Sequence, residues 1–90
     1  MNRNAYADLI MEKFSKRIKK GDLTVETEKK LNGSVVIRYR CGEIRYGHII
    51  SQLEMMMYGN NDDCLVDYII SNMADGMKKA GYDPSEYLEV

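Results

Sequence analysis

The only histidine of the chain, His48, stands close in sequence to two side chains that could act as nucleophiles, Cys41 and Ser51. A catalytic acid–base scheme needs a base, a partner that orients it and a cleft that holds the substrate. Ser51 fits better as the cap of a helix, and Cys41 falls on the apolar side of a predicted strand. We therefore expect His48 to be a structural residue and the protein not to be an enzyme.

Metal and cofactor chemistry finds little support in the sequence. Cys41 and Cys64 are far apart without a CxxC spacing, and only His48 could join them, whereas a structural zinc site normally takes four ligands. The sequence contains no glycine-rich phosphate loop, Walker motif or metal-binding pair of histidines. It predicts no metal, no cofactor and reduced thiols.

Three arginines alternate along two predicted strands, and guanidinium groups are well suited to phosphate or carboxylate. The predicted strand pairing sets Glu28 opposite Arg38 and Glu26 opposite Arg40, which would form a ladder of ion pairs across the sheet. Arg45 falls beside Arg40 with no acid left over. Arg45 is therefore the binding candidate among the three.

Charge is divided unequally along the chain. Residues 1–48 hold 11 Lys+Arg and 6 Asp+Glu, or +5, and residues 49–90 hold 2 and 8, or −6, although the net charge is only −1. Such asymmetry concerns surfaces and partners rather than the fold. The candidate basic surface comprises Lys13, Arg17, Lys20 and Arg45, and the candidate acidic surface comprises Asp67, Tyr68 and Asp75.

The run Met55-Met56-Met57 suggests an adaptable binding groove, because methionine repacks easily around different partners. A small domain, however, needs its apolar residues for the core. Leu53, Met56 and Met57 fall on one side of the predicted helix, so we expect these three to be buried. Met55 lies on the flank of that helix and is the residue expected to be exposed.

The first 21 residues predict one amphipathic helix. Apolar residues recur at three- and four-residue spacing from Ala5 to Lys20, with Asn4 as cap and Gly21 as the end. Positive charge in the last turns suits the negative end of the helix dipole. The residues expected there are Lys16, Arg17, Lys19 and Lys20.

Alternating apolar and polar residues then predict a three-stranded meander. Asn32-Gly33 indicates a hairpin, and a three-residue loop, Asn32 to Ser34, matches the strand faces better than a two-residue loop. This loop would align Thr27 with Tyr39 and Val25 with Cys41. A two-residue turn at Gly42-Glu43 leads into a third strand to about Ile50, which pairs Cys41 with Ile44 and Tyr39 with Tyr46.

The remaining residues predict two helices and a final turn. Ser51 and Glu54 form a capping box for a helix that ends at Gly59; in an alternative, this helix begins near His48 and shortens the third strand.

Asp62 or Asp63 is expected to cap a long helix that reaches Ala80 and ends at Gly81. Its predicted apolar arc comprises Leu65, Val66, Ile69, Ile70, Met73, Met77 and Ala80. Gly76 lies in this arc and suggests close approach of a strand or helix. Asp83-Pro84 would begin one last turn, through Leu88.

These patterns predict a single small α+β domain over residues 1–90, with a three-stranded antiparallel meander in the order α-β-β-β-α-α and helices mainly on one face. No signal peptide or spanning segment is evident, so we expect a cytoplasmic protein without a membrane partner. Its expected function is macromolecule binding. We expect it to be a regulatory or inhibitory protein, of the kind that phages and mobile elements encode, acting through contact with another protein.

Two other functions follow from the charges. The first is nucleic-acid binding through the basic first helix and Arg45. The second is mimicry of nucleic acid, for which carboxylates of the acidic C-terminal half would have to form one continuous exposed row. Surfaces of opposite sign also allow a homo-dimer, in which the basic surface of one copy meets the acidic surface of another.

Overall fold

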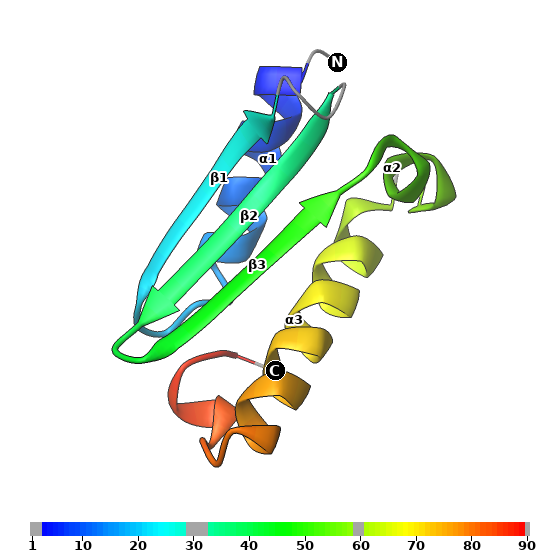
Figure 1. Ribbon diagram of the computed structural model, residues 1–90. Helices are drawn as coiled ribbons and strands as arrows, with labels where there is room; N and C mark the ends of the chain where they lie inside the picture. The colour runs from blue at the N-terminus through cyan, green and yellow to red at the C-terminus, as the bar shows by residue number, and fades with distance from the viewer. Residues whose placement is uncertain (1–2, 29–32, 59–60, 90) are drawn as a thin grey trace.

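The computed structural model describes residues 3–28, 33–58 and 61–89, and its elements follow the predicted α-β-β-β-α-α order (Figure 1). The chain begins with α1 (Arg3–Ser15) and continues with β1 (Asp22–Glu28), β2 (Ser34–Cys41) and β3 (Ile44–Ile50). It then forms α2 (Gln52–Tyr58), the long α3 (Asp62–Lys79) and a short 3₁₀ helix, η2 (Pro84–Glu86).

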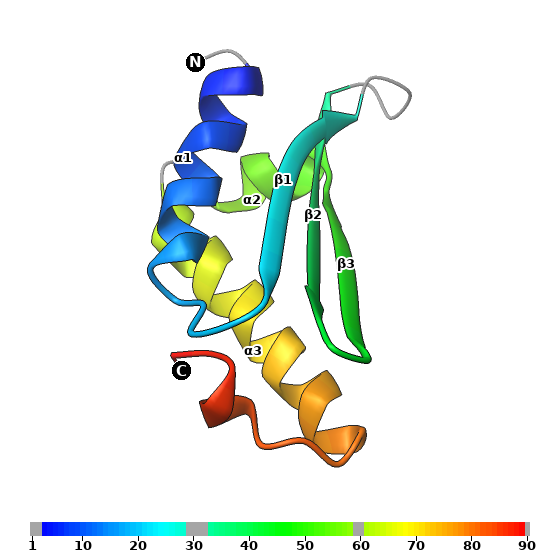
Figure 2. The same cartoon turned by 90° about the vertical axis from the view of Figure 1, so that its left-hand side faces the viewer.

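The three strands form one antiparallel sheet in the order β1-β2-β3. Helices α1 and α3 lie on the same side of it, and none of the described helices crosses the other side, here called the open face (Figure 2). Cys41 pairs with Ile44 and Tyr39 with Tyr46, as predicted. Because β3 continues to Ile50, the alternative with a shortened third strand is wrong.

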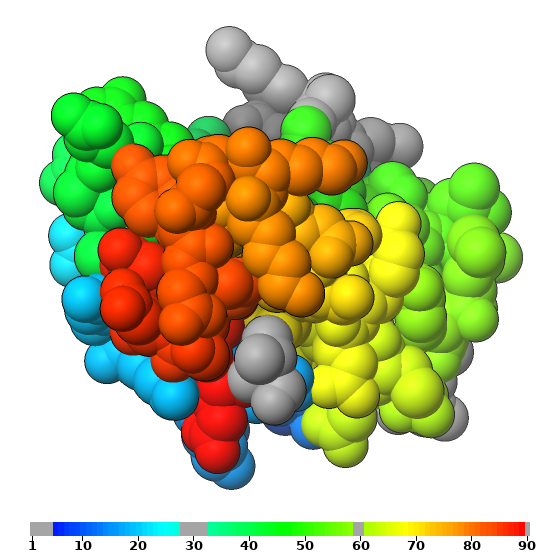
Figure 3. Space-filling view, turned by 90° about the horizontal axis from the view of Figure 1, so that it is seen from below, coloured from blue at the N-terminus to red at the C-terminus, as the bar shows by residue number. Residues whose placement is uncertain are grey.

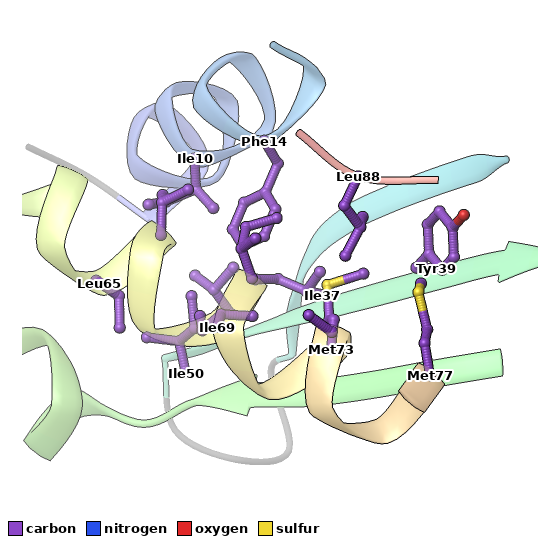
Figure 4. Close-up of a cluster of buried hydrophobic side chains, with 14 of the residues drawn as sticks. Ile10, Phe14, Ile37, Tyr39, Ile50, Leu65, Ile69, Met73, Met77 and Leu88 are labelled. Atoms are coloured by element: carbon purple, nitrogen blue, oxygen red, sulfur yellow. The ribbon is translucent and has the colours of Figure 1, made fainter. Parts of the chain in front are cut away.

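The core fills the space between the sheet and the two longer helices (Figure 4). Every layer contributes fully buried side chains: Ile10 and Phe14 from α1, Ile37 and Ile50 from the sheet, Leu65, Ile69 and Met73 from α3, and Leu88 from the C-terminal segment. The apolar arc of α3 is confirmed except at its end, where Ala80 is exposed and Ala74 is buried instead.

The connection between β1 and β2 is longer than predicted. Pairing extends to Glu28 and Ser34, so Ser34 belongs to β2 and not to a three-residue loop. Asn32, at the other end of the predicted loop, lies outside the described residues. Gly33 has a φ of 97°, in the left-handed region that glycine adopts readily.

The longer connection displaces the strand register. Tyr39 lies opposite Leu23 rather than Thr27, and Val25 lies opposite Ile37 rather than Cys41. The displacement is an even number of residues, so each side chain keeps its predicted face although its neighbours differ.

Helix α1 ends five residues earlier than predicted, at Ser15. Ile18 instead forms an isolated antiparallel bridge with Leu88, flanked by two backbone hydrogen bonds of 2.7 Å. Residues 16–20 are therefore not helical, because pairing with the C-terminal segment provides hydrogen-bond partners that a helix would otherwise supply. Asn4 lies inside α1, so its predicted role as the cap is also wrong.

The turn into β1 places Gly21 against the ring of Tyr39. Gly21 has a φ of +107°, and a Cβ atom added there would lie 2.7 Å from Cε2 of Tyr39. The Tyr39 hydroxyl donates a 2.7 Å hydrogen bond to the carbonyl of Lys20, and burial raises the pKa of Tyr39. Tyr39 thus ties the turn before β1 to the centre of the sheet.

Helix α3 differs from prediction at its start and at its glycine. The side chain of Asn61 accepts a 3.2 Å hydrogen bond from the amide of Cys64, so the cap is Asn61 and not Asp62 or Asp63. A Cβ atom added at Gly76 would meet nothing within 4 Å, so the expected close approach is absent from the described part of the chain.

The chain turns after α3 at Gly81, whose φ is 90°, and forms the predicted final turn. Asp83 accepts a 3.1 Å hydrogen bond from the amide of Ser85, and Pro84 begins η2. Leu88, which follows this turn, is fully buried. Figure 3 shows the turn, in red-orange, at the surface beside the orange end of α3.

Candidate functional site

The predicted basic surface is not a free stripe on a helix. Lys13 Nζ lies 2.7 Å from Asp63 Oδ1, and Arg17 lies 2.5 Å from Asp67 Oδ1. Lys20 lies over the ring of Tyr87, 4.7 Å from its centroid. Lys13 reaches Asp63 from within α1. Arg17 and Lys20 lie beyond the end of the helix at Ser15 and are turned toward α3 and the C-terminal segment.

The predicted acidic surface is correspondingly reduced. Asp67 is paired with Arg17, while Asp75 is exposed and Tyr68 packs its ring 6.1 Å from that of Tyr58. Nucleic-acid mimicry requires a continuous row of exposed carboxylates, but Asp63 and Asp67 already neutralise cations of α1 and the segment after it. One ion pair, Arg17–Asp67, therefore joins the two predicted surfaces within the molecule, while Lys13 pairs with Asp63, which is outside the predicted acidic surface.

The hydrogen bond from Lys13 holds the pKa of Asp63 below its ordinary value. A carboxyl whose pKa is lowered by folding adds stability above its unfolded pKa and loses it as the pH falls through the folded pKa. We expect Asp63→Asn to lower the free energy of unfolding at pH 7 but to change it little well below the folded pKa. Urea unfolding across pH 2 to 7 measures this. Asp75→Asn is the control, and a loss from Asp63→Asn that did not vary with pH would contradict the assignment.

The arginines of the open face pair differently from prediction because of the altered register. Arg38 forms an ion pair with Glu26, and Arg40 lies 4.0 Å from Asp22. The predicted Glu26–Arg40 ion pair is wrong, and Glu28 lies opposite Ser34 rather than Arg38. Arg45 lies opposite Arg40, as predicted, and forms no ion pair with the described residues.

His48 contacts a carboxylate and an aromatic ring. Its Nε2 lies 3.1 Å from Glu54 Oε2, and its ring stacks against that of Tyr46 with centroids 6.5 Å apart. Ser51 Oγ accepts a 3.1 Å hydrogen bond from the Glu54 amide, which confirms Ser51 as a cap. The Glu54 carboxylate, however, reaches His48 instead of completing the capping box.

A catalytic role for His48 would require a nucleophile at its ring. Within the described part of the chain, no hydroxyl or thiol is hydrogen-bonded to it. Cys41 is half-buried beside the core, Cys64 is exposed on α3, and no metal-binding group of three or more His, Cys, Asp or Glu residues occurs among the residues described.

The largest departure from prediction is on α2, which has no buried residue. Leu53, Met56 and Met57 are 66%, 77% and 72% exposed, although all three were predicted to be buried. Met55, predicted to be exposed, packs against the core. Gly59, the predicted end of this helix, lies outside the described residues.

Ile49 extends the exposed apolar surface onto the sheet. Ile49 is 49% exposed on the open face, three residues before the first residue of α2, and α2 projects beyond the end of β3 (Figure 1). We call Ile49, Leu53, Met56 and Met57 the apolar patch. Spacing alone could not identify it, because Met55 and Tyr58 form an equally good apolar side for a helix this short.

Comparison with protein families, curated proteins and solved structures gave no match. Among the described residues, no helix has both the length and the apolar character needed to cross a membrane.

Proposed function

We propose that this protein is a small macromolecule-binding module that acts by contact with another protein, and that the apolar patch is its contact surface. The observation that supports this is the exposure of Leu53, Met56 and Met57 on one short helix. Scattered exposed apolar residues are ordinary, but a group of large ones on a monomer marks an interaction site.

The energetic argument is one of size. Burying one such side chain contributes about 1.5 to 3 kcal/mol, and a whole domain is stable by only about 5 to 15 kcal/mol. A 90-residue chain that leaves three of these side chains in water forgoes a large part of its stability. A partner that covers the patch would recover this free energy on binding, and methionine adapts well to the shape of a partner.

The mode of action that fits this surface is binding to, and covering, a surface of a partner protein, as a regulatory or inhibitory protein does. Nucleic-acid binding is the weaker candidate, because Lys13 and Arg17 are engaged by Asp63 and Asp67. A homo-dimer through the two charged surfaces is weaker for the same reason.

The test replaces Leu53, Met56 and Met57 together with serine. These side chains are already exposed, so we expect the free energy of unfolding to change by less than about 1 kcal/mol. Capture from a lysate of the source cell should yield a stoichiometric partner protein when the parent chain is the bait. The triple variant should capture at least about tenfold less of it, because the substitutions remove the side chains that anchor the partner. Quantitative mass spectrometry gives the ratio.

The matched control replaces three exposed lysines, Lys16, Lys78 and Lys79, with serine. This variant should retain the partner. Equal capture by the triple variant and the parent would contradict the proposal. A parent dimer that becomes monomeric in the triple variant, measured by light scattering, would instead assign the patch to self-association.

A further inference from the structure

Strand β3 is a free edge of the sheet. Among the described residues, β3 pairs with β2 only, and no backbone group of another element hydrogen-bonds to it. The two-residue turn makes Cys41 and Ile44 a hydrogen-bonded pair, and hydrogen-bonded and non-hydrogen-bonded pairs alternate along an antiparallel ladder. The backbone N–H and C=O groups of Arg45, Gly47 and Ile49 therefore point away from β2.

A hollow lies beside this edge, on the helix side of the sheet. It has a volume of 220 Å³ and is lined by Ile44 and Tyr46 of β3 and by Met73, Gly76 and Met77 of α3, among others. Because Gly76 lacks a side chain and a Cβ atom there would touch nothing, the hollow has room for side chains from outside. Alternate residues of a strand added to β3 would point into it.

On the open face, the same edge presents Arg45, a cation without an ion-pair partner in the described part of the chain. Arg45 lies directly opposite Arg40, and like charges in this arrangement are unfavourable. Both line a hollow of 480 Å³ that also includes Gly47, where an added Cβ atom would meet nothing within 4 Å. A carboxylate on an added strand would lie beside Arg45 and relieve this repulsion.

We propose that the edge of β3 binds an extended segment of a partner protein as a fourth strand, with acidic side chains beside Arg45 and apolar side chains over Gly76. Main-chain hydrogen bonds supply the affinity in this mode of recognition, and alternate side chains supply the specificity. A second copy of β3 fits less well, because its Arg45, Gly47 and Ile49 offer no carboxylate.

This inference rests on the proposed function in that the partner is a protein, but it uses a surface distinct from the apolar patch. The probe is a blocked peptide, acetyl-Thr-Val-Glu-Val-Glu-Val-Thr-amide, added to the full chain labelled with nitrogen-15. We expect saturable NMR shifts and slower hydrogen exchange at the amides of Arg45, Gly47 and Ile49. Two control peptides carry lysine in place of glutamate, or N-methyl groups on alternate amides, and both should bind at least about tenfold more weakly.

Charge reversal gives the sharpest test. Arg45 is exposed, so Arg45→Glu should leave the fold intact. The variant should bind the glutamate peptide about tenfold more weakly and the lysine peptide more tightly than the parent chain does. A second variant, Gly47→Pro, removes the backbone N–H that points away from β2 and leaves the hydrogen bonds to β2 in place. It should also lower the affinity for the glutamate peptide.

Several results would overturn the proposal: absence of shifts at the three edge amides, equal affinity for the glutamate and lysine peptides, or protection of these amides in a dimer of the free chain. The triple serine variant of the apolar patch should still bind the peptide. Peptide binding that fails while lysate capture succeeds would reject the added strand alone, and the reverse result would reject only the apolar patch.

Discussion

Replacing Gly21 with alanine is expected to destabilise the protein by about 2 to 4 kcal/mol, because two costs combine at this position. The φ of +107° is unfavourable for any residue with a side chain. The new Cβ atom would also lie 2.7 Å from Cε2 of the Tyr39 ring, which the hydroxyl hydrogen bond to Lys20 holds in place. The ring must shift or the turn must open, and urea unfolding measures the cost.

Gly42 provides the matched control. Its φ is +60°, but an added Cβ atom there would meet nothing within 4 Å. Gly42→Ala should therefore cost only the backbone term, about 1 to 2 kcal/mol. Equal losses at the two positions would show that the contact with Tyr39 adds nothing.

Leu88→Ala is the second large effect, with an expected loss of about 2 to 5 kcal/mol. Leu88 is fully buried, although it lies near the end of the described chain. Its backbone pairs with Ile18, so the cavity would lie where the C-terminal segment joins the segment after α1. Chemical denaturation gives the loss, and hydrogen exchange at the Lys19 amide, which donates to Tyr87, should accelerate.

The control is Glu89→Ala in the same segment. The Glu89 side chain is exposed, while its backbone amide makes the 2.7 Å bond to the Arg17 carbonyl. Truncating the side chain keeps that bond, so the change should stay within about 0.5 kcal/mol. A similar loss in the two variants would contradict a core role for Leu88.

Sequence patterning predicted the order of elements because alternation and helical spacing are local signals. Strand faces were also predictable, since side-chain direction depends only on whether a position is odd or even. The β1–β2 register was not: a displacement by an even number of residues leaves Leu23 and Tyr39 on the core face and changes only which residues are opposite.

The C-terminal end of α1 could not be predicted from the local sequence, for a different reason. Residues 16–20 have good helical spacing, but Ile18 pairs with Leu88, far away in sequence. Nothing local to either segment indicates this bridge. The same long-range pairing brings Arg17 to Asp67 and so ties the predicted basic surface to the acidic helix.

The candidate site was predicted only in part. Arg45 emerged from the surplus of arginine over acid, and its position opposite Arg40 is confirmed. The apolar patch was missed because hydrophobicity alone predicts burial. This helix has seven residues, and apolar residues occur on more than one of its sides. Only the packing of Met55 against the core decides which side faces water.

Exposure of Met56 and Met57 also has a consequence for the chemistry of the sample. Thioether oxidation converts methionine into a polar sulfoxide, and accessible sulfurs react first. Met11 and Met55 are partly covered and Met73 and Met77 are buried, so among the described methionines oxidants reach Met56 and Met57 most readily. Mild oxidation would thus alter the contact surface before it reached the core.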